Sequence, residues 1–199
     1  FSFMAVVTTY RNYDDFRSMG FNVLAPEYPG YLDFPGVPSE NAVEREGQTA
    51  YDYLRVVKQV PAENIVIFGA SLGGGIAIDL ASHVQAGALV VASTFSSISA
   101  VAQKSYPFLP IRLLSKNPFE SDRKIGRVKM PVLVIHSIED DLFPIEHGQK
   151  LYSLAPSQKQ FVKIRGRHDG TFTHATVNPN FFSDIVTFLN TKAGFHLRQ

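Results

Sequence analysis

The sequence contains no cysteine, no excess of charge of either sign and no long apolar run. Without cysteine the chain cannot form disulfides, use a thiol nucleophile or hold zinc through thiolates, and it suits an oxidising or a reducing compartment equally. Lys and Arg number 19 against 18 Asp and Glu, which gives a formal net charge of +1. Such a balance creates no global field to attract nucleic acid or anionic lipid. We therefore expect no nucleic-acid partner, and the compartment, cytoplasmic or secreted, stays open.

No apolar run approaches the roughly 20 residues that a membrane-spanning helix needs. The chain opens on the apolar segment FSFMAVV, without the basic region and cleavage site of a signal peptide. We expect a soluble chain without a membrane span, either a mature form or a fragment of a longer protein. Its 199 residues and 22.1 kDa suit one domain, residues 1–199, with a core of its own. The oligomeric state stays open.

Apolar, β-branched runs alternate with helical patterns along the chain. Most of the runs are continuously apolar, which is typical of strands covered by helices on both faces. The sequence therefore predicts an α/β fold with a mostly parallel sheet of about six strands. The strands are expected at residues 3–7, 22–26, 64–68, 88–92, 131–136 and 160–164, and helices at 39–60, 73–84, 145–155 and in the C-terminal segment.

Three segments carry more specific expectations. The C-terminal helix is expected to begin with Asn178 as its N-cap and Pro179 at its first position. Residues 93–129 interrupt the alternation and are expected to form a short cap-like excursion. In the segment 39–60, the apolar residues of the helical pattern are Val43, Ala50, Tyr53, Leu54 and Val57.

The segment FGASLGGG places one serine, Ser71, among four glycines, between an apolar run and a helical pattern. A serine nucleophile stands on a sharp turn at the carboxyl end of a strand, where neighbouring side chains would collide with the strand or the following helix. Gly69 and Gly73 complete the pattern G-x-S-x-G in this strand-turn-helix setting. The helix N-terminus also offers free N–H groups to a developing oxyanion. Because the segment lacks the lysine and hydroxyl of a P-loop, we interpret Ser71 as a nucleophile.

Serine is a poor nucleophile at neutral pH, so it needs a base and a group that orients the base. In a parallel sheet these groups also lie at the carboxyl ends of strands. The loop after residues 131–136 offers Glu139, Asp140 and Asp141, and the loop after residues 160–164 offers His168. The resulting chain order of Ser, Asp and His differs from the chymotrypsin-like and subtilisin-like orders.

At these residues the chain resembles the α/β-hydrolases, specifically the small lid-less esterases and the prolyl-oligopeptidase-like hydrolases. The resemblance covers nearly the whole chain: it includes GFNVLAPEYPGY at the family's fourth strand, FGASLGG at its nucleophile elbow, PVLVIHSIEDDLFP at its acid loop and RGRHDG at its histidine turn. It implies an α/β-hydrolase fold. Alignment of His136 and Pro144 with the family's histidine and proline implies Asp140 as the acid, with Asp141 as the runner-up.

Six histidines compete for the role of base. His168 follows a turn glycine at the correct strand end and ranks first, and His174 is the alternative. His168, Asp169 and His174 also suggest a metal site, but no recognised ligand spacing supports it, so we expect no metal. His136 is expected to be a buried hydrogen-bonding residue beneath the acid loop. The remaining histidines are interpreted as surface, packing or tail residues: His83, His147 and His196.

An oxyanion hole needs two donors, and the backbone N–H of Leu72 is expected to be the first. The second normally comes from the loop after the family's third strand, often His-Gly-x. Here TTYRNYDDF follows with neither residue, so Thr9 or Tyr10 is expected to supply the N–H. The two antiparallel strands that usually precede this point are absent from the sequence. Loss of one oxyanion donor lowers turnover about a hundredfold to a thousandfold.

The resemblance implies hydrolysis of an acyl bond through an acyl-enzyme, without a cofactor and with a small-molecule ester as the partner. The absence of a lid domain suggests an exposed cleft for short or medium acyl chains. A peptidase, an amidase or a thioesterase of the same fold stays open, as does a catalytically weak binding module. The residues expected to line the cleft are Tyr28, Phe95, Tyr106, Phe108 and Leu109.

Overall fold

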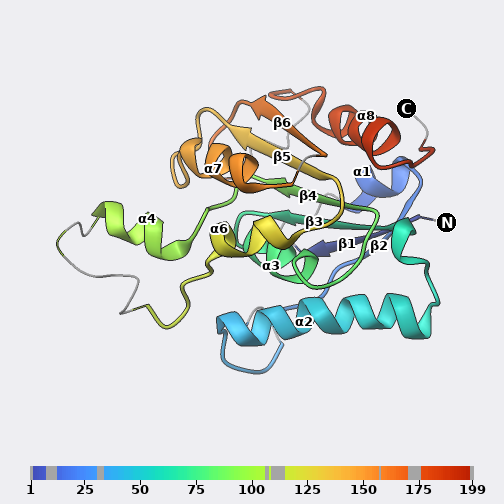
Figure 1. Cartoon of the computed structure of the whole chain (residues 1–199), viewed down its shortest axis with the longest axis horizontal. Coiled ribbons are helices and arrows are strands. Elements are labelled where there is room, and N and C mark those ends of the chain that lie inside the picture. Colours follow the sequence, from blue (N-terminus) through green and yellow to red (C-terminus); the bar gives the residue numbers. More distant parts are fainter. Residues whose placement is uncertain are drawn as a thin grey trace.

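One parallel sheet lies at the centre of the computed structural model (Figure 1), which describes residues 2–7, 13–30, 34–105, 108, 115–156, 158–169 and 176–197. Its strands follow the spatial order β2-β1-β3-β4-β5-β6, and every neighbouring pair is parallel. The predicted α/β fold, with a parallel sheet of about six strands, is therefore confirmed. The strands are β1 (Ser2–Val7), β2 (Phe21–Leu24), β3 (Ile65–Ala70), β4 (Ala88–Ala92), β5 (Val132–Ser137) and β6 (Lys159–Ile164).

Helices pack on both faces of this sheet. The first and last helices, α1 (Tyr13–Ser18) and α8 (Phe181–Lys192), share one face. The opposite face is covered by α2 (Glu40–Asp52), α3 (Leu72–Ala81) and α7 (Glu146–Leu154). Two shorter helices, α4 (Ile98–Ser105) and α6 (Ser121–Lys124), follow β4, and α4 projects away from the sheet in Figure 1.

The central strands are buried on both faces because successive side chains of a strand point to opposite sides. In β3, Ile65 and Ile67 pack with the helices of one face, and Val66 and Phe68 pack with those of the other. All four side chains are buried. Each contributes about 1.5–3 kcal/mol relative to an exposed position. This two-sided burial explains why the strand sequences are continuously apolar rather than alternating.

The apolar residues named in the segment 39–60 differ in their exposure. Val43, Ala50 and Leu54 are buried, whereas Tyr53 and Val57 are 40% and 64% exposed. After Asp52 the helix widens into a π-helical turn, Tyr53–Val57, in which the N–H of Lys58 donates to the carbonyl oxygen of Tyr53. Because this wider turn breaks the 3.6-residue period, Tyr53 and Val57 at its two ends are turned toward solvent while Leu54 stays buried.

The predicted start of the C-terminal helix is wrong. Helix α8 begins at Phe181 with Asn180 in the cap position, and Asn178 lies outside the helix. The Asn178 side chain instead accepts the N–H of Arg165 at 3.0 Å and donates to its carbonyl oxygen at 2.6 Å. The oxygen and the nitrogen of the Asn178 side-chain amide therefore both bond Arg165, directly after β6, and neither atom caps the helix.

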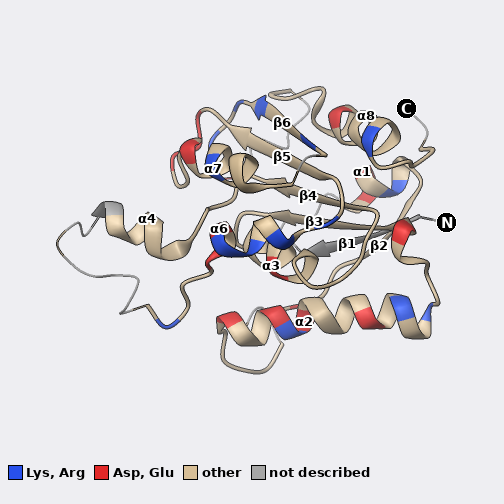
Figure 2. Cartoon of the chain, in the orientation of Figure 1, with Lys and Arg blue, Asp and Glu red and all other residues tan. Residues whose placement is uncertain are grey.

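Charged residues lie on the helices rather than on the central strands (Figure 2). Helix α2 carries four acidic residues, Glu40, Glu44, Glu46 and Asp52, and one basic residue, Arg45. Glu40 and Glu44 pair with Lys124 of α6 at 3.5 and 2.7 Å, so part of this acidic charge is neutralised by a neighbouring helix.

Candidate active site

Three polar residues lie at the carboxyl edge of the sheet, each after a different strand. Ser71 follows β3, Asp140 lies in the loop after β5, and His168 lies in the loop after β6. Parallel strands bring their carboxyl ends to one edge, where ligand sites of open α/β sheets form. Ser71, Asp140 and His168 therefore lie at the same edge of the sheet.

Ser71 stands on a strained turn between β3 and α3. Its backbone has φ 52° and ψ −125°, a region that residues with a side chain seldom adopt. A Cβ atom on Gly69 would overlap the carbonyl oxygen of Gly73, and a Cβ on Gly74 would overlap the Thr94 side chain. Gly69, the first glycine of the G-x-S-x-G pattern, therefore allows the strand and the helix to approach closely, and Gly74, outside the pattern, allows the helix to approach Thr94.

Hydrogen bonds from β4 hold this turn in place. The N–H of Ser71 donates to the carbonyl oxygen of Ala92 at 3.0 Å. The Thr94 hydroxyl donates to the carbonyl oxygen of Ser71 at 2.7 Å. Strained residues of this kind persist only where the surrounding structure fixes them, and they cluster at functional sites.

A chain of short contacts links the three residues. Ser71 Oγ lies 2.7 Å from His168 Nε2, and His168 Nδ1 lies 2.9 and 3.0 Å from the two carboxylate oxygens of Asp140. An ionised carboxylate only accepts hydrogen bonds, so Nδ1 carries the imidazole proton and Nε2 is left to accept the serine hydroxyl. This is the proton arrangement that a serine nucleophile with a histidine base requires.

The Asp140 carboxylate is fixed by its own loop. Its Oδ1 atom accepts the N–H groups of Leu142 at 3.0 Å and of Phe143 at 2.7 Å, and the side chain is fully buried. The ring of Phe143 then packs edge-on against the imidazole of His168, with 4.7 Å between the ring centroids. Asp140 and Phe143 together fix the plane and the orientation of the His168 ring.

The acids on either side of Asp140 hold the backbone of the histidine loop. Glu139 accepts the N–H of Gly166 at 3.0 Å and pairs with Arg165 at 2.6 Å. Asp141 accepts the N–H of His168 at 3.0 Å. These backbone N–H groups are the largest cause that lowers the pKa of each of the two carboxyls, and Arg165 beside Glu139 and Arg167 beside Asp141 lower it further. Of the three acids in this loop, Asp140 contacts the imidazole of His168, Asp141 contacts the backbone of His168, and Glu139 contacts the backbone of Gly166.

His136 lies beneath the acid loop, as expected from the sequence, and is fully buried. Its Nε2 atom donates to the carbonyl oxygen of Phe143 at 2.8 Å and lies 3.8 Å from Asp140 Oδ2. Burial lowers the pKa of His136 below its ordinary value of 6.5 and outweighs the opposing effects of the Phe143 carbonyl and the Asp140 charge. The neutral imidazole thus holds the loop that carries the acid.

Only one of the expected oxyanion donors, Leu72, lies among the described residues. Leu72 is the first residue of α3, where a backbone N–H has no intrahelical partner. Its position directly after Ser71 is the one that the expected oxyanion donor requires. Thr9 and Tyr10, the candidates for the second donor, lie outside the described residues.

The residues predicted to line the substrate cleft lie in different surroundings. Tyr28 and Phe95 are buried in one cluster with Val43, Ile76, Phe119 and Phe143, whereas Phe108 is 97% exposed. Tyr106 and Leu109 lie outside the described residues, as does His174, the alternative base. Among the residues that the structure describes, no group of three or more acidic or histidine side chains is placed to hold a metal ion.

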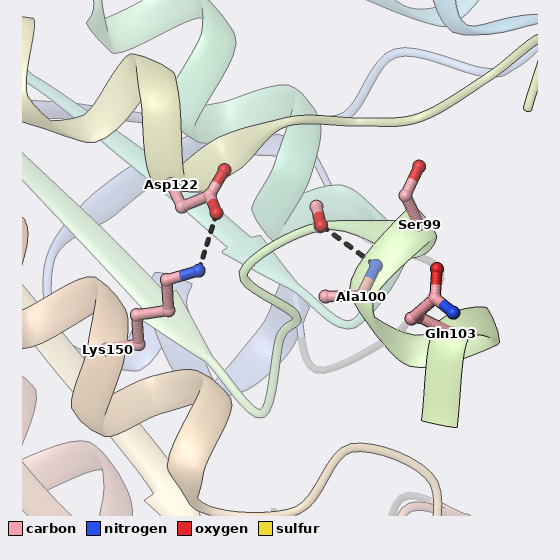
Figure 3. A pocket seen from close by; sticks show the side chains of 6 residues that line it. Ser99, Ala100, Gln103, Asp122 and Lys150 are labelled. Carbon is pink, nitrogen blue, oxygen red and sulfur yellow. Dashed lines mark hydrogen bonds and ion pairs between the residues drawn. The ribbon is translucent and has the colours of Figure 1, made fainter. Parts of the chain in front are cut away.

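Two cavities contain residues that the sequence did not single out. One, of about 170 Å³, is lined by Leu72 together with residues from the start of α2 and from the segment before α6. The other, of about 230 Å³, lies between α4, α6 and α7 (Figure 3), where Lys150 pairs with Asp122 at 2.7 Å and Ser99 and Gln103 point from α4. Only the first includes a neighbour of Ser71. Of its lining residues, Leu72 and Val43 had been named from the sequence and the others had not. Phe143, which packs on His168, was not named either, and its one sequence signal is an apolar residue three positions after Asp140.

No helix in the described part of the chain is both long and apolar enough to cross a bilayer. The described residues therefore contain no candidate membrane span.

Comparisons with known proteins identify chains that are similar to this one. No family model matches the chain. An uncharacterised protein of Mycobacterium tuberculosis is 35% identical over 150 residues, covering 75% of this chain and 53% of that protein. Human alpha/beta hydrolase domain-containing protein 17C is 32% identical over 149 residues, covering 73% and 43% of the two chains.

Among solved structures, an esterase of Pyrococcus furiosus superposes with a TM-score of 0.76 at 18% identity, over 97% of this chain and 84% of that chain. At that identity the similarity shows the fold. The chain spans about half the length of the curated relatives that it matches. With its parallel sheet, its serine on a strained strand-to-helix turn and these relatives, the chain belongs to the α/β-hydrolase family.

Proposed function

We propose that the chain is a serine hydrolase that cleaves carboxylic esters of short to medium acyl chains through an acyl-enzyme. The observation that carries this proposal is the continuous hydrogen-bonded chain from Ser71 through His168 to Asp140. A nucleophile, a base and a group that orients the base are the three parts that acyl transfer to serine requires.

In the first half of the reaction, His168 Nε2 takes the proton of the Ser71 hydroxyl while Oγ attacks the ester carbonyl carbon. The carbonyl electrons move to oxygen, and the N–H of Leu72 stabilises this oxyanion. When the tetrahedral intermediate collapses, the bond to the alcohol oxygen breaks and His168 returns the proton to that oxygen. The products of this half-reaction are the free alcohol and an acyl group on Ser71.

In the second half, water takes the place of the alcohol. His168 removes a proton from water, the hydroxide oxygen attacks the acyl carbon, and collapse of the second intermediate returns the proton to Ser71 Oγ and releases the acid. Asp140 keeps the imidazole in the required tautomer and stabilises the imidazolium that forms in both steps. Glu139 and Asp141 act through the backbone of the histidine loop, so we propose them as positioning residues.

Hydrolysis of p-nitrophenyl esters from acetate to palmitate tests the proposal. We expect kcat/KM to be highest for short and medium chains and to fall to background in Ser71→Ala. Ser153→Ala is a matched control, because Ser153 is exposed and its hydroxyl bonds only the carbonyl oxygen of Lys150 on the same helix. Equal rates in the wild type and Ser71→Ala would refute a serine hydrolase and favour a binding module without catalysis.

An aminoacyl p-nitroanilide, assayed beside the esters, separates an esterase from a peptidase or an amidase. The same three residues serve acyl transfer to serine from esters, thioesters and amides. We expect ester turnover to exceed anilide turnover. The reverse order would replace the esterase by a peptidase on the same machinery.

A further inference from the structure

The cavity of about 170 Å³ beside Leu72 has mainly apolar walls. They are formed by Pro38, Val43, Leu72 and Phe119, and the polar lining residues are Ser39, Glu40 and Asn117. Leu72 follows Ser71 directly, so the Cα atoms of the two residues are about 3.8 Å apart. The cavity is therefore lined by the chain neighbour of Ser71, the residue whose backbone N–H is the expected oxyanion donor.

The polar groups at the rim of this cavity form hydrogen bonds with one another. Asn117 Oδ1 accepts the N–H of Glu40 at 2.9 Å, and Glu40 Oε2 accepts the N–H of Phe119 at 2.9 Å. The second carboxylate oxygen of Glu40 lies 3.5 Å from the ammonium group of Lys124. Because these donors and acceptors satisfy one another, the walls that remain for a ligand are apolar.

Phe119 adopts a strained backbone at this cavity. Its φ is 41°, in the left-handed region that bulky residues seldom adopt. The ring is buried and packs edge-on against Phe95 with 6.0 Å between the centroids. Glu40 holds the N–H of Phe119, so this carboxylate fixes the strained turn that aims the ring. Such strain is typical of ligand clamps and active sites.

The side of Ser71 on which the cavity lies indicates its occupant. His168 has to return a proton to the leaving alcohol, so the alcohol must lie beside the imidazole. The described lining residues include none from the loops that carry Asp140 and His168. The ester carbonyl oxygen points to the N–H of Leu72, and the cavity begins at Leu72. We propose that this cavity, which we call the acyl pocket, binds the acyl group of the substrate. The inference rests on the proposed function.

The volume of the acyl pocket sets the size of that group. An apolar cavity of about 150 Å³ accommodates a benzene molecule. The acyl pocket, at about 170 Å³, therefore accommodates a group of benzoyl or hexanoyl size. Val43 and Phe119 limit longer or branched groups, and the substrates are esters of compact apolar acids.

A series of p-nitrophenyl esters with Val43 variants tests the acyl pocket. We expect kcat/KM to be highest for hexanoate or benzoate. Val43→Ile adds one methylene to the wall and should lower the hexanoate-to-acetate ratio about tenfold. Val43→Ala should raise the octanoate-to-hexanoate ratio by a similar factor. Val56→Ala is the matched control, because Val56 is 73% exposed and lines no part of this cavity.

A second series varies the alcohol and keeps the acyl group as acetate, with phenyl, ethyl and hexyl esters. We expect the Val43 variants to change the acyl preference and not the alcohol preference. If they change the alcohol preference instead, the pocket binds the leaving group and the inference is overturned. The same holds if Val43→Ile and Val43→Ala alter the acyl ratios no more than Val56→Ala does.

A binding experiment separates failure of the acyl pocket from failure of the proposed function. Benzamide, an uncharged probe, is titrated into ¹⁵N-labelled Ser71→Ala protein and followed by NMR. We expect shifts of the backbone N–H groups of Leu72 and Phe119 and of the Asn117 side-chain amide, even in a chain that does not hydrolyse esters. Absence of these shifts overturns the acyl pocket regardless of catalysis.

Discussion

The acid and histidine loops and the walls of the acyl pocket are built in different ways. Residues 139–141 and 165–168 are two short segments at the ends of neighbouring strands, β5 and β6. The acyl pocket instead depends on Glu40 bonding to residues 77 and 79 positions away. Loops after adjacent parallel strands meet at one edge of the sheet whatever their length. The pocket walls meet only after α2 and the segment before α6 have packed, so substrate fit depends on contacts between segments farther apart in the chain than the acid and histidine loops, whose bonds span 27 positions.

The largest expected effect separates the two neighbouring acids of the acid loop. Asp140→Asn should lower kcat for p-nitrophenyl acetate on the order of 10³- to 10⁴-fold, because an amide cannot hold the imidazole in the required tautomer. Asp141→Asn should stay within about tenfold, because its amide oxygen still accepts the N–H of His168 and only the charge is lost. Equal losses in the two variants would contradict the distinct roles proposed for them.

A second prediction concerns the turn that both regions share. Gly69→Ala should lower the free energy of unfolding by about 3 kcal/mol, because the new methyl group overlaps the backbone of Gly73. Gly126→Ala is the control, since a Cβ there meets its nearest neighbour, the carbonyl oxygen of Leu154, at an ordinary 3.7 Å. Urea unfolding followed by circular dichroism measures both. A Gly69→Ala protein as stable as Gly126→Ala would show that the turn relaxes freely.

His136 should make the acid loop sensitive to mild acid. Its folded pKa lies below 6.5, so the unfolded chain binds the proton more readily. Stability is complete above about pH 6.5 and falls as the pH drops below it, by at most about 1.4 kcal/mol per pH unit for one group. Urea titrations between pH 7.5 and pH 5 measure the slope. His136→Gln should flatten it, and an unchanged slope would assign the pH dependence to other groups.

The smallest expected effect lies at the rim of the acyl pocket. Glu40→Ala leaves the N–H of Phe119 without its acceptor, so the KM for p-nitrophenyl hexanoate should rise about threefold, the value of a modest hydrogen bond. Glu40→Gln keeps an acceptor and should lose less. Steady-state kinetics of the two variants provide the measurement. Equal effects would show that the charge of Glu40, and not its bond to Phe119, is what matters.

The sequence predicted the features that short motifs mark and missed those that no motif marks. The strands, the order of Ser71, Asp140 and His168, and the burial of His136 follow from patterns within a few neighbouring residues. The cap of α8 could not be predicted, because Asn178 forms its bonds with Arg165, 13 residues away. The exposure of Tyr53 and Val57 could not be predicted either, since no local pattern indicates a π-helical turn. Ser71 and His168 are 97 positions apart, but each lies in a recognisable motif at a strand end, whereas no motif marks the bonds of Asn178 or the π-helical turn.

The acyl-enzyme is tested most directly by mass spectrometry of the intact chain quenched with acid during turnover of p-nitrophenyl acetate. We expect a species heavier by one acetyl group, with the acetyl on the peptide that contains Ser71, and no such species in Ser71→Ala. In His168→Ala the acetylated species should form far more slowly. Turnover without any acetyl group on Ser71, or acetylation at the same rate in His168→Ala, would contradict a serine hydrolase that depends on Ser71, His168 and Asp140.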